Sequence, residues 1–224
     1  MFTKATFDFL DELAGNNNRA WFEANKPRYE SLVREPALEF IAAMAPVLKT
    51  FAPNFRAEPR KIGGSLMRVF RDTRFSRDKT PYKTNIGIQF RHALGKDVHA
   101  PGFYVHIATD ECFFAVGCWH PESDALGKIR DHVAQKPDNW FAARDGKKFA
   151  ALWDLSGDSL SRPPRGYDSH HPAIADLKRK DFIALAPLSI KEATGTGLVK
   201  LAGARFAASA AFMKFLCTAL EVPY

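Results

Sequence analysis

The spacing of apolar residues changes twice along this chain, and that change limits the folds it can adopt. Between residues 4 and 50, apolar side chains recur every three or four positions, which is the period of a helix. Between residues 65 and 119 they alternate with polar side chains, which is the period of a strand. After Pro121 the helical spacing returns. A block of strands between two helical blocks predicts an α+β fold.

Two prolines divide the first helical block. Pro27 and Pro36 each suit the first turn of a new helix, where a missing N–H group costs nothing. We therefore expect three or four helices within residues 1–60 rather than one long helix. Gly63 and Gly64 then mark a turn before the first strand.

The strand block reads as an antiparallel meander. Strands are predicted at residues 65–71, 85–91, 103–107 and 112–119, with a turn-rich loop at residues 72–81. The short polar turn at residues 109–111 connects the last two of these strands, and a connection this short joins antiparallel strands. We therefore place an antiparallel sheet of about four or more strands in residues 65–120.

Residues 121–224 are predicted to be mainly helical. A polar, proline-rich loop interrupts the helical spacing at residues 161–172, and residues 195–220 read as one closing helix. No repeat, low-complexity run or long flexible linker divides the sequence. We therefore predict a single domain over residues 1–224, in which the meander is packed by N-terminal, middle and C-terminal helices.

Composition narrows the classes of function. The chain has 224 residues and a net charge of +7, which favours acidic partners without requiring them. Its three cysteines fit a reducing compartment, and we predict no disulfide. The first twenty residues lack the build of a targeting segment, and no apolar stretch approaches the length of a membrane span. We therefore expect a cytoplasmic protein with no membrane partner.

The most charged segment is residues 68–83, RVFRDTRFSRDKTPYK. It holds six cations against the carboxylates of Asp72 and Asp78, which gives a local net charge of +4. The cations are Arg68, Arg71, Arg74, Arg77, Lys79 and Lys83. The forked guanidinium of Arg and the mobile ammonium of Lys suit phosphate or carboxylate groups, so this segment predicts an anion site. The alternative is a solvated loop in which the two carboxylates pair with neighbouring cations.

Two further features bear on that site. The sheet face opposite the core is predicted to be polar, with Tyr104 and His106 on one of its strands. Such a face either binds a ligand or is simply solvated. The loop at residues 161–172 is stiffened by prolines and presents Arg165 and Tyr167, although an ordinary long connection has the same composition.

The first hypothesis for function is a pocket that binds a phosphorylated or carboxylated small molecule. Its ligand-binding residues would be Arg68, Arg71, Arg74, Lys79, Tyr82, Lys83, Tyr104, His106, Arg165 and Tyr167. If the protein is an enzyme, His106 or Asp72 would move protons while the arginines hold developing negative charge. No cofactor is predicted. No zinc site is predicted either, because Cys112, Cys118 and His120 lack a spacing that would preorganise one.

Two other hypotheses use the same segment. In the second, the protein binds nucleic acid, the cations contact phosphates, and Phe75, Tyr82 or Trp119 stack on bases. In the third, the protein is a structural or interaction module whose Asp72 and Asp78 pair internally with the arginines. The second requires an exposed basic surface, whereas the first requires a cleft.

Four segments together resemble a known family. They are FLDELAGNNNRAWF from residue 9, the basic segment at 68–83, PGFY at 101–104 and RPPRGYD at 162–168. Over nearly its whole length the chain resembles the family described as domain of unknown function 2461, and the string RDTRFSRDKTPYK is the most specific part. The resemblance implies a single intact domain of a bacterial-type cytosolic protein. It places the distinctive string on the candidate site and transfers no catalytic residues.

Overall fold

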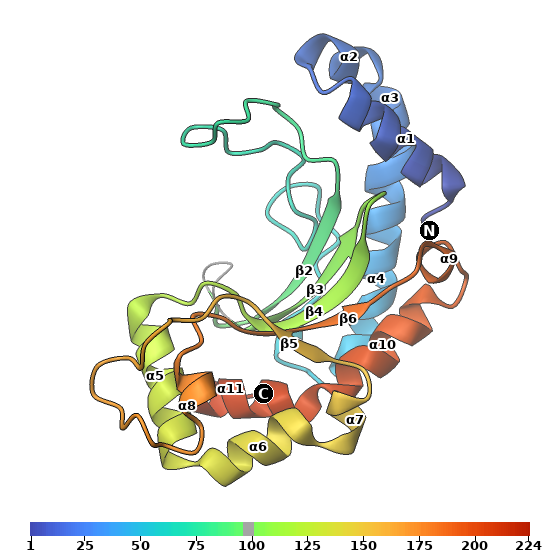
Figure 1. Ribbon diagram of the computed structural model, residues 1–224. Coiled ribbons are helices and arrows are strands. Elements are labelled where there is room, and N and C mark those ends of the chain that lie inside the picture. Colours follow the sequence, from blue (N-terminus) through green and yellow to red (C-terminus); the bar gives the residue numbers. More distant parts are fainter. Residues whose placement is uncertain (96–100) are drawn as a thin grey trace.

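A six-stranded antiparallel sheet organises the fold (Figure 1). The computed structural model describes residues 1–95 and 101–224. Its strands are β1 (Phe55–Arg56), β2 (Ile86–His92), β3 (Gly102–Ile107), β4 (Cys112–Cys118), β5 (Asp154–Ser156) and β6 (Phe182–Pro187). Their order across the sheet is β1-β2-β3-β4-β6-β5, so the predicted meander forms its centre.

Helices precede and follow the meander, as the changes of period predict. The N-terminal ones are α1 (Lys4–Gly15), α2 (Arg19–Ala24), α3 (Lys26–Tyr29), the π-helix η1 (Glu30–Arg34) and α4 (Glu35–Lys49). The later ones are α5 (Ser123–Gln135), α6 (Pro137–Asp145), α7 (Lys147–Ala150), α8 (Ile174–Leu177), α9 (Ile190–Ala193), α10 (Leu198–Ala208) and α11 (Ala210–Ala219). Pro27 and Pro36 lie in the first turns of α3 and α4, as predicted.

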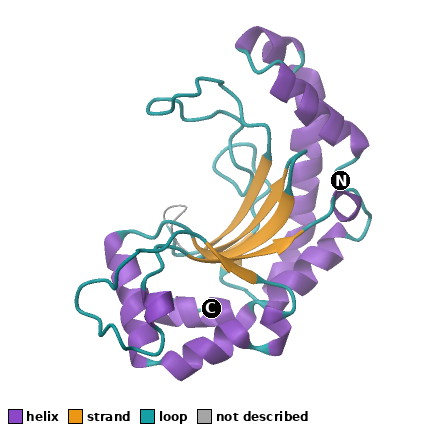
Figure 2. Cartoon of the chain, viewed as in Figure 1, coloured by secondary structure: helices purple, strands orange, loops and turns teal. Residues whose placement is uncertain are grey.

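One face of the sheet is packed by helices, with α4, α10 and α11 lying against it (Figures 1 and 2). The centre of this core is Phe206 on α10, which is fully buried. Its ring centroid lies 4.9 Å from that of Phe103, 5.4 Å from that of Phe114 and 6.3 Å from that of Phe90. One side chain therefore joins three strands to the helical layer, and its burial contributes about 2–3 kcal/mol.

The opposite face of β2, β3 and β4 has loops rather than helices beside it (Figure 2). We call it the open face. The strand register places Gly87, His106 and Phe113 side by side on it, with Tyr104 two residues before His106. A sheet with one packed face and one open face produces the alternation of apolar and polar residues that the sequence shows.

The structure confirms the α+β fold and departs from the predicted elements in four places. β1 lies within residues 1–60, which were predicted to be helical. Residues 65–71 form two isolated bridges, Leu66↔Ile88 and Phe70↔Tyr82, rather than a regular strand. β5 and β6 lie within the part predicted to be mainly helical, because the apolar run of β6 (FIALAP) hides its alternation. The predicted closing helix is divided into α10 and α11 at Ser209, whose hydroxyl donates to the Phe206 carbonyl at 2.8 Å.

No helix within residues 1–95 and 101–224 combines the length and the apolar character that crossing a membrane requires. The three cysteines are buried and carry free thiols. Cys118 on β4 and Cys217 on α11 belong to the core, which matches their apolar sequence surroundings.

Candidate functional site

The basic segment lies at the end of a long hairpin that extends from the sheet. Residues 65–71 run antiparallel to residues 81–89, and the Met67 N–H donates to the Gly87 carbonyl at 2.9 Å. Farther out, the Arg71 N–H donates to the Pro81 carbonyl, also at 2.9 Å. Figure 1 shows the connecting loop projecting away from the helical layer. We call residues 72–80 the hairpin tip.

The two sides of this hairpin differ in length near its base. Between the bridges Leu66↔Ile88 and Phe70↔Tyr82 the chain advances four residues on one side and six on the other. The second side therefore holds two additional residues, which form a bulge. Since the Lys83 N–H donates to the Val69 carbonyl at 2.7 Å, the bulge begins directly after Lys83.

The N-terminal helices hold the hairpin by its Tyr82. The Asn17 amide donates to the Tyr82 carbonyl at 2.9 Å and accepts from the Tyr82 N–H at 3.1 Å. The Tyr82 ring stacks on Phe22, with 4.0 Å between ring centroids and an angle of 18°. Tyr82 is therefore a core residue, 2% exposed, and its predicted role as a ligand contact would require it to leave the core.

Within the hairpin tip, three cations are bound internally. Arg71 donates to the Asp78 carboxylate and to the Thr80 hydroxyl. Arg74 forms a two-pronged pair with Asp72, at 3.0 Å from Nε and 2.7 Å from Nη2. The Lys79 ammonium donates to the Thr73 carbonyl at 2.8 Å. These contacts shape the tip, as the hypothesis of internal pairing expects.

The hydrogen bonds from Arg74 lower the pKa of Asp72 to about 2. A backbone hydrogen bond from Thr80, followed by the bond from Arg71, lowers the pKa of Asp78 to about 2. Both carboxylates are therefore ionised at neutral pH. A group with so low a pKa is a weak proton acceptor, which argues against a catalytic role for Asp72.

Two cations at the base of the hairpin have a different environment. The side chains of Arg68 and Lys83 form no hydrogen bond and no ion pair with any residue in the described ranges. Lys83 is half-buried, and burial together with the charge of Arg68 lowers the pKa of its ammonium. Two like charges thus lie close to each other, which is unfavourable, and the charge of Arg68 also contributes to lowering the pKa of Asp72.

Asn85, Tyr104 and His106 form a polar cluster on the open face. The Tyr104 hydroxyl lies 3.2 Å from His106 Nδ1, and the Asn85 amide lies 3.5 Å from the same nitrogen. Because both groups can donate, Nδ1 is assigned as the acceptor, which places the ring proton on Nε2. The imidazole also stacks on Phe113, with 4.6 Å between centroids and an angle of 3°.

Burial lowers the pKa of His106 and raises that of Tyr104 to about 12. At neutral pH the imidazole is therefore neutral and the phenol protonated. The cluster presents hydrogen-bond donors without a charge of its own, so the local charge comes from Arg68 and Lys83.

Gly87 brings the hairpin and the cluster together. A Cβ at this position would lie 2.8 Å from the Tyr104 hydroxyl and 3.0 Å from the Met67 sulfur. The Tyr104 ring can therefore lie across β2 and approach Met67, the residue before Arg68, only because position 87 has no side chain.

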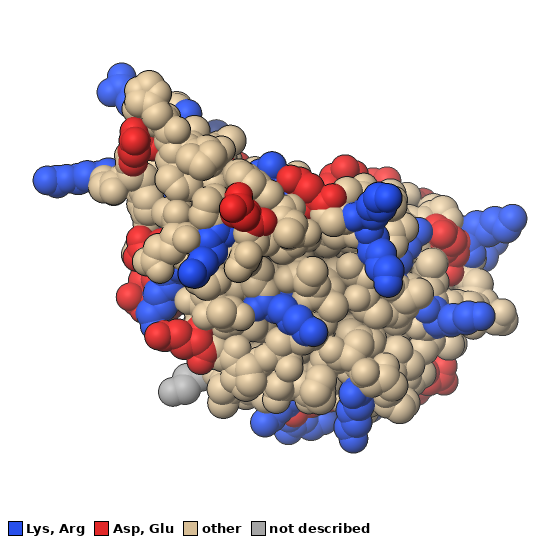
Figure 3. Space-filling view, turned by 90° about the horizontal axis from the view of Figure 1, so that it is seen from below, with Lys and Arg blue, Asp and Glu red and all other residues tan. Residues whose placement is uncertain are grey.

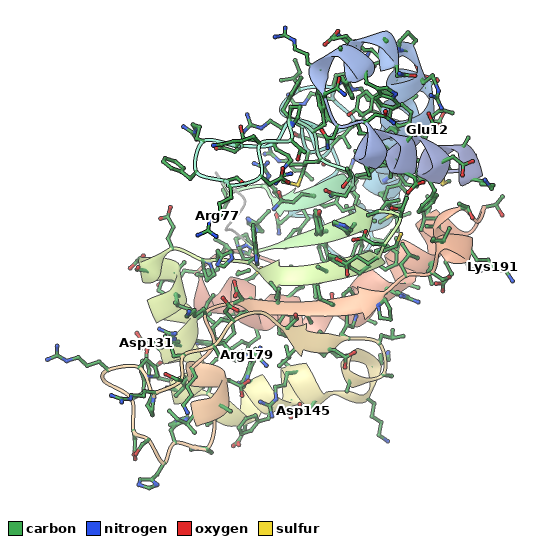
Figure 4. All side chains as sticks on the ribbon, turned by 45° about the horizontal axis from the view of Figure 1, so that its top comes forward. Glu12, Arg77, Asp131, Asp145, Arg179 and Lys191 are labelled. Carbon is green, nitrogen blue, oxygen red and sulfur yellow. The ribbon has the colours of Figure 1, made fainter. Side chains whose placement is uncertain are left out.

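The outermost part of the hairpin tip is exposed. Phe75 is 95% exposed, and the Arg74 guanidinium lies 5.9 Å from its ring centroid. The Arg77 side chain forms no hydrogen bond or ion pair with the described part of the chain. Figure 4 shows it directed from the tip towards the sheet.

The structure does not bring Arg165 and Tyr167 to this site. Their loop lies at the opposite end of the molecule from the hairpin tip, beside α5 and α8 (Figure 1). The Tyr167 hydroxyl donates to Asp131 at 2.8 Å, and burial is the main cause that raises the Tyr167 pKa to about 12. Tyr167 thus anchors its own loop to α5, and Arg165 is exposed there.

Sequence reasoning missed a hollow of about 660 Å³ on the open face. It lies where the turn between β3 and β4 meets β5 and β6, beside Phe113. Only the polar turn at residues 109–111 was visible in the sequence, because the two strands that form the other walls were not predicted. Among the described residues, no group of three or more potential metal ligands is close enough to hold a metal ion.

Comparison with known proteins gives one match. A family model described as "Conserved hypothetical protein (DUF2461)" matches residues 5–215, which is nearly the whole chain. No curated protein and no solved structure matches. The match confirms the resemblance carried by the helical segment from residue 9 and by the basic string.

Proposed function

The chain belongs to the DUF2461 family, and we propose that it binds a phosphorylated or carboxylated small molecule at Arg68 and Lys83. The observation that carries the proposal is the closeness of these two cations, neither of which forms a hydrogen bond or an ion pair with a residue that the structure describes, although Asp72 lies within electrostatic reach of Arg68. Lys83 is also half-buried. In a partly buried site, an anion that accepts from both would remove the repulsion and replace lost hydration. Arg71, Arg74 and Lys79 do not share this property, since they already have partners, and Arg77 lies exposed in the hairpin tip.

The polar cluster supports the same proposal. Tyr104 stays protonated because its pKa is raised to about 12, so it can donate to an acceptor but is a poor base. The proton on His106 Nε2 is a further donor, because its Nδ1 faces Tyr104 and Asn85. An anion with additional oxygens would therefore meet neutral donors beside the two cations.

The test is stabilisation by anions at constant ionic strength. Thermal unfolding would be followed with inorganic phosphate, pyrophosphate, a sugar phosphate or succinate, against sodium chloride as the baseline. At a concentration one hundred times Kd, binding adds about 2.7 kcal/mol, which raises Tm by roughly 5–10 °C for a chain of this size.

Variants locate the binding. Arg68→Gln and Lys83→Met should each remove most of the anion-dependent shift, whereas Lys200→Gln should retain it. Lys200 is an exposed residue of α10 that forms no ion pair with a described residue, so it controls for the loss of one charge. The proposal fails if no anion stabilises beyond chloride, or if the control loses as much as the site variants.

A second candidate function is binding of single-stranded nucleic acid at the hairpin tip, and the exposure of Phe75 favours it. An exposed aromatic ring beside an unpaired Arg77 can stack on a base while the guanidinium contacts phosphate. The burial of Tyr82 removes one of the predicted stacking residues, whereas Trp119 is 54% exposed. On the face seen from below, Lys and Arg side chains are spread singly among Asp and Glu, without a continuous basic stripe (Figure 3).

Fluorescence anisotropy with single-stranded oligonucleotides at 50 and 200 mM salt tests this candidate. Phe75→Ala should weaken binding about tenfold, since stacking contributes roughly 1–3 kcal/mol per base. Ile62→Ala, at a residue 90% exposed outside the tip, should leave binding unchanged. Absence of binding at 50 mM salt, where phosphate contacts are strongest, removes the candidate.

A further inference from the structure

Two arginines face each other at the edge of the sheet. Arg56 on β1 and Arg91 on β2 are direct partners in the strand register. Partners of this kind lie on the same face with Cβ atoms about 4.5–5.5 Å apart, and like charges at such positions are destabilising. Arg91 follows Gly87 by four residues on β2, so the pair belongs to the open face. Two like charges there favour an anion between them, unless both guanidiniums turn out into solvent.

The carboxylates do not neutralise this pair. Glu58 Oε1 lies 3.9 Å from Arg56 Nη1, and Glu58 Oε2 lies only 2.6 Å from Arg60 Nη2. Arg91 donates from Nε to Gln89 Oε1 at 3.2 Å and forms no ion pair with any residue that the structure describes. Three guanidinium groups therefore share one carboxylate, and both terminal nitrogens of Arg91 have no partner in the described chain.

A hollow of about 120 Å³ lies between these groups. Both arginines and Gln89 line it, together with Gly63 and Gly64 from the turn that precedes the hairpin. Gly63 has a φ of +69°, and the N–H groups of the two glycines form no hydrogen bond within the described ranges. Successive N–H groups in such a turn form concavities that bind anions. Glu58 lines the hollow too, and its ion pair with Arg60 offsets its charge.

We propose that this hollow binds a phosphate group, held between the guanidiniums of Arg56 and Arg91 and by the N–H groups of Gly63 and Gly64. Forked guanidiniums and backbone N–H groups are the donors from which phosphate oxygens accept. Pockets that enclose whole small molecules have volumes of roughly 300–1,000 Å³. The smaller hollow has room for the phosphate group itself, so the rest of a phosphorylated ligand would lie outside it.

This phosphate site goes beyond the proposed anion site, because it uses neither Arg68 nor Lys83. Arg91 lies five residues after Ile86, where β2 begins, and five residues of strand span about 16 Å. Lys83 precedes Ile86, so the two sites are at opposite ends of β2. One phosphate group cannot occupy both, and each site can therefore be tested without the other.

Phosphate titration of Lys83→Met, followed by amide NMR, tests the inference in a protein that lacks the first site. At constant ionic strength the Gly63 and Gly64 amide signals should shift saturably with inorganic phosphate and with a sugar phosphate, but not with chloride. Arg91→Gln should weaken this binding at least about tenfold, since hydrogen bonds to charged groups are lost. Lys200→Gln, which removes one exposed charge from α10, should leave it unchanged.

Arg56 supplies a second comparison if Arg91→Gln unfolds, because its side chain is exposed on an edge strand. Arg56→Gln should weaken phosphate binding more than Arg56→Lys, which keeps the charge and removes the fork. Unshifted glycine amides, equal shifts with chloride, or equal binding by Arg56→Gln and Lys200→Gln would each overturn the inference. Such a failure leaves the proposal for Arg68 and Lys83 standing, because Lys83→Met has removed that site from the measurement.

Discussion

Asn17 gives the sharpest test of how the hairpin is held. Its amide satisfies both the N–H and the carbonyl of Tyr82, at 3.1 Å and 2.9 Å, in a partly buried contact between the N-terminal helices and the hairpin. Asn17→Ala removes both bonds and leaves two backbone groups without a protein partner. Because Tyr82 directly precedes Lys83, the same change should loosen the base of the proposed anion site.

The magnitude follows from the two bonds. Each hydrogen bond contributes about 0.5–1.5 kcal/mol net, and a buried group left unsatisfied costs about 1–3 kcal/mol. Since Asn17 is only partly buried, water can reach part of the gap, and we expect a loss of about 2 kcal/mol. For a chain of this length, that loss lowers Tm by roughly 4–8 °C.

The assay combines urea unfolding with amide hydrogen exchange. Asn17→Ala should lower the unfolding free energy and selectively reduce protection of the Tyr82 amide. Asn16→Ala is the matched control, since the Asn16 amide donates only to the exposed Glu12 carbonyl at 2.9 Å. The proposed clamp would be refuted by a loss of unfolding free energy below about 0.5 kcal/mol, the lower bound for one hydrogen bond. A loss no larger than that of the control would refute it as well.

Three further outcomes are expected. Because the pKa of Lys83 is lowered in the folded state, the unfolded state binds this proton more readily, so stability should rise with pH as the folded ammonium deprotonates. If Lys83→Met has a higher unfolding free energy in urea than the wild type, the difference should be largest at neutral pH. It should shrink as the pH approaches 10.5, the ordinary pKa of a lysine ammonium. Gly87→Ala should displace the Tyr104 hydroxyl from His106, cost about 1–3 kcal/mol and alter the NMR titration of the imidazole. Phe206→Ala should cost about 3–5 kcal/mol in urea unfolding, because its ring contacts three strands.

The central sheet was predictable because its two faces differ in chemistry. On β3, buried Phe103 and Val105 alternate with Tyr104 and His106, and this alternation is visible in the sequence. β6 was not predictable on that basis. Its outward residues Ile183 and Leu185 are as apolar as its core residues, since they line the less polar end of the open face.

The charge of residues 68–83 was predictable, but the pairing of its side chains was not. Arg71 bonds Asp78, seven residues later, whereas Arg74 bonds Asp72, two residues earlier. Because the loop has no regular secondary structure, the sequence spacing does not predict which carboxylate pairs with which arginine. The position of Arg165 likewise depends on how β5 and β6 join the sheet and on the anchoring of Tyr167 to α5, neither of which appears as a local pattern.

The basic segment at residues 68–83 is therefore divided into a tip with internal ion pairs and a base without them. The net charge of the segment does not show this division. Both of its carboxylates are occupied at the hairpin tip, where they bind Arg71 and Arg74, and Tyr82 is occupied by the core. Among the described residues, Arg68, Arg77 and Lys83 form no ion pair, and two of them, Arg68 and Lys83, flank the bulge at the edge of the open face. The contact of Tyr82 with Asn17 and Phe22 fixes the chain next to Lys83 and so holds these two charges close despite their repulsion, which is the preorganisation that the proposed anion site requires.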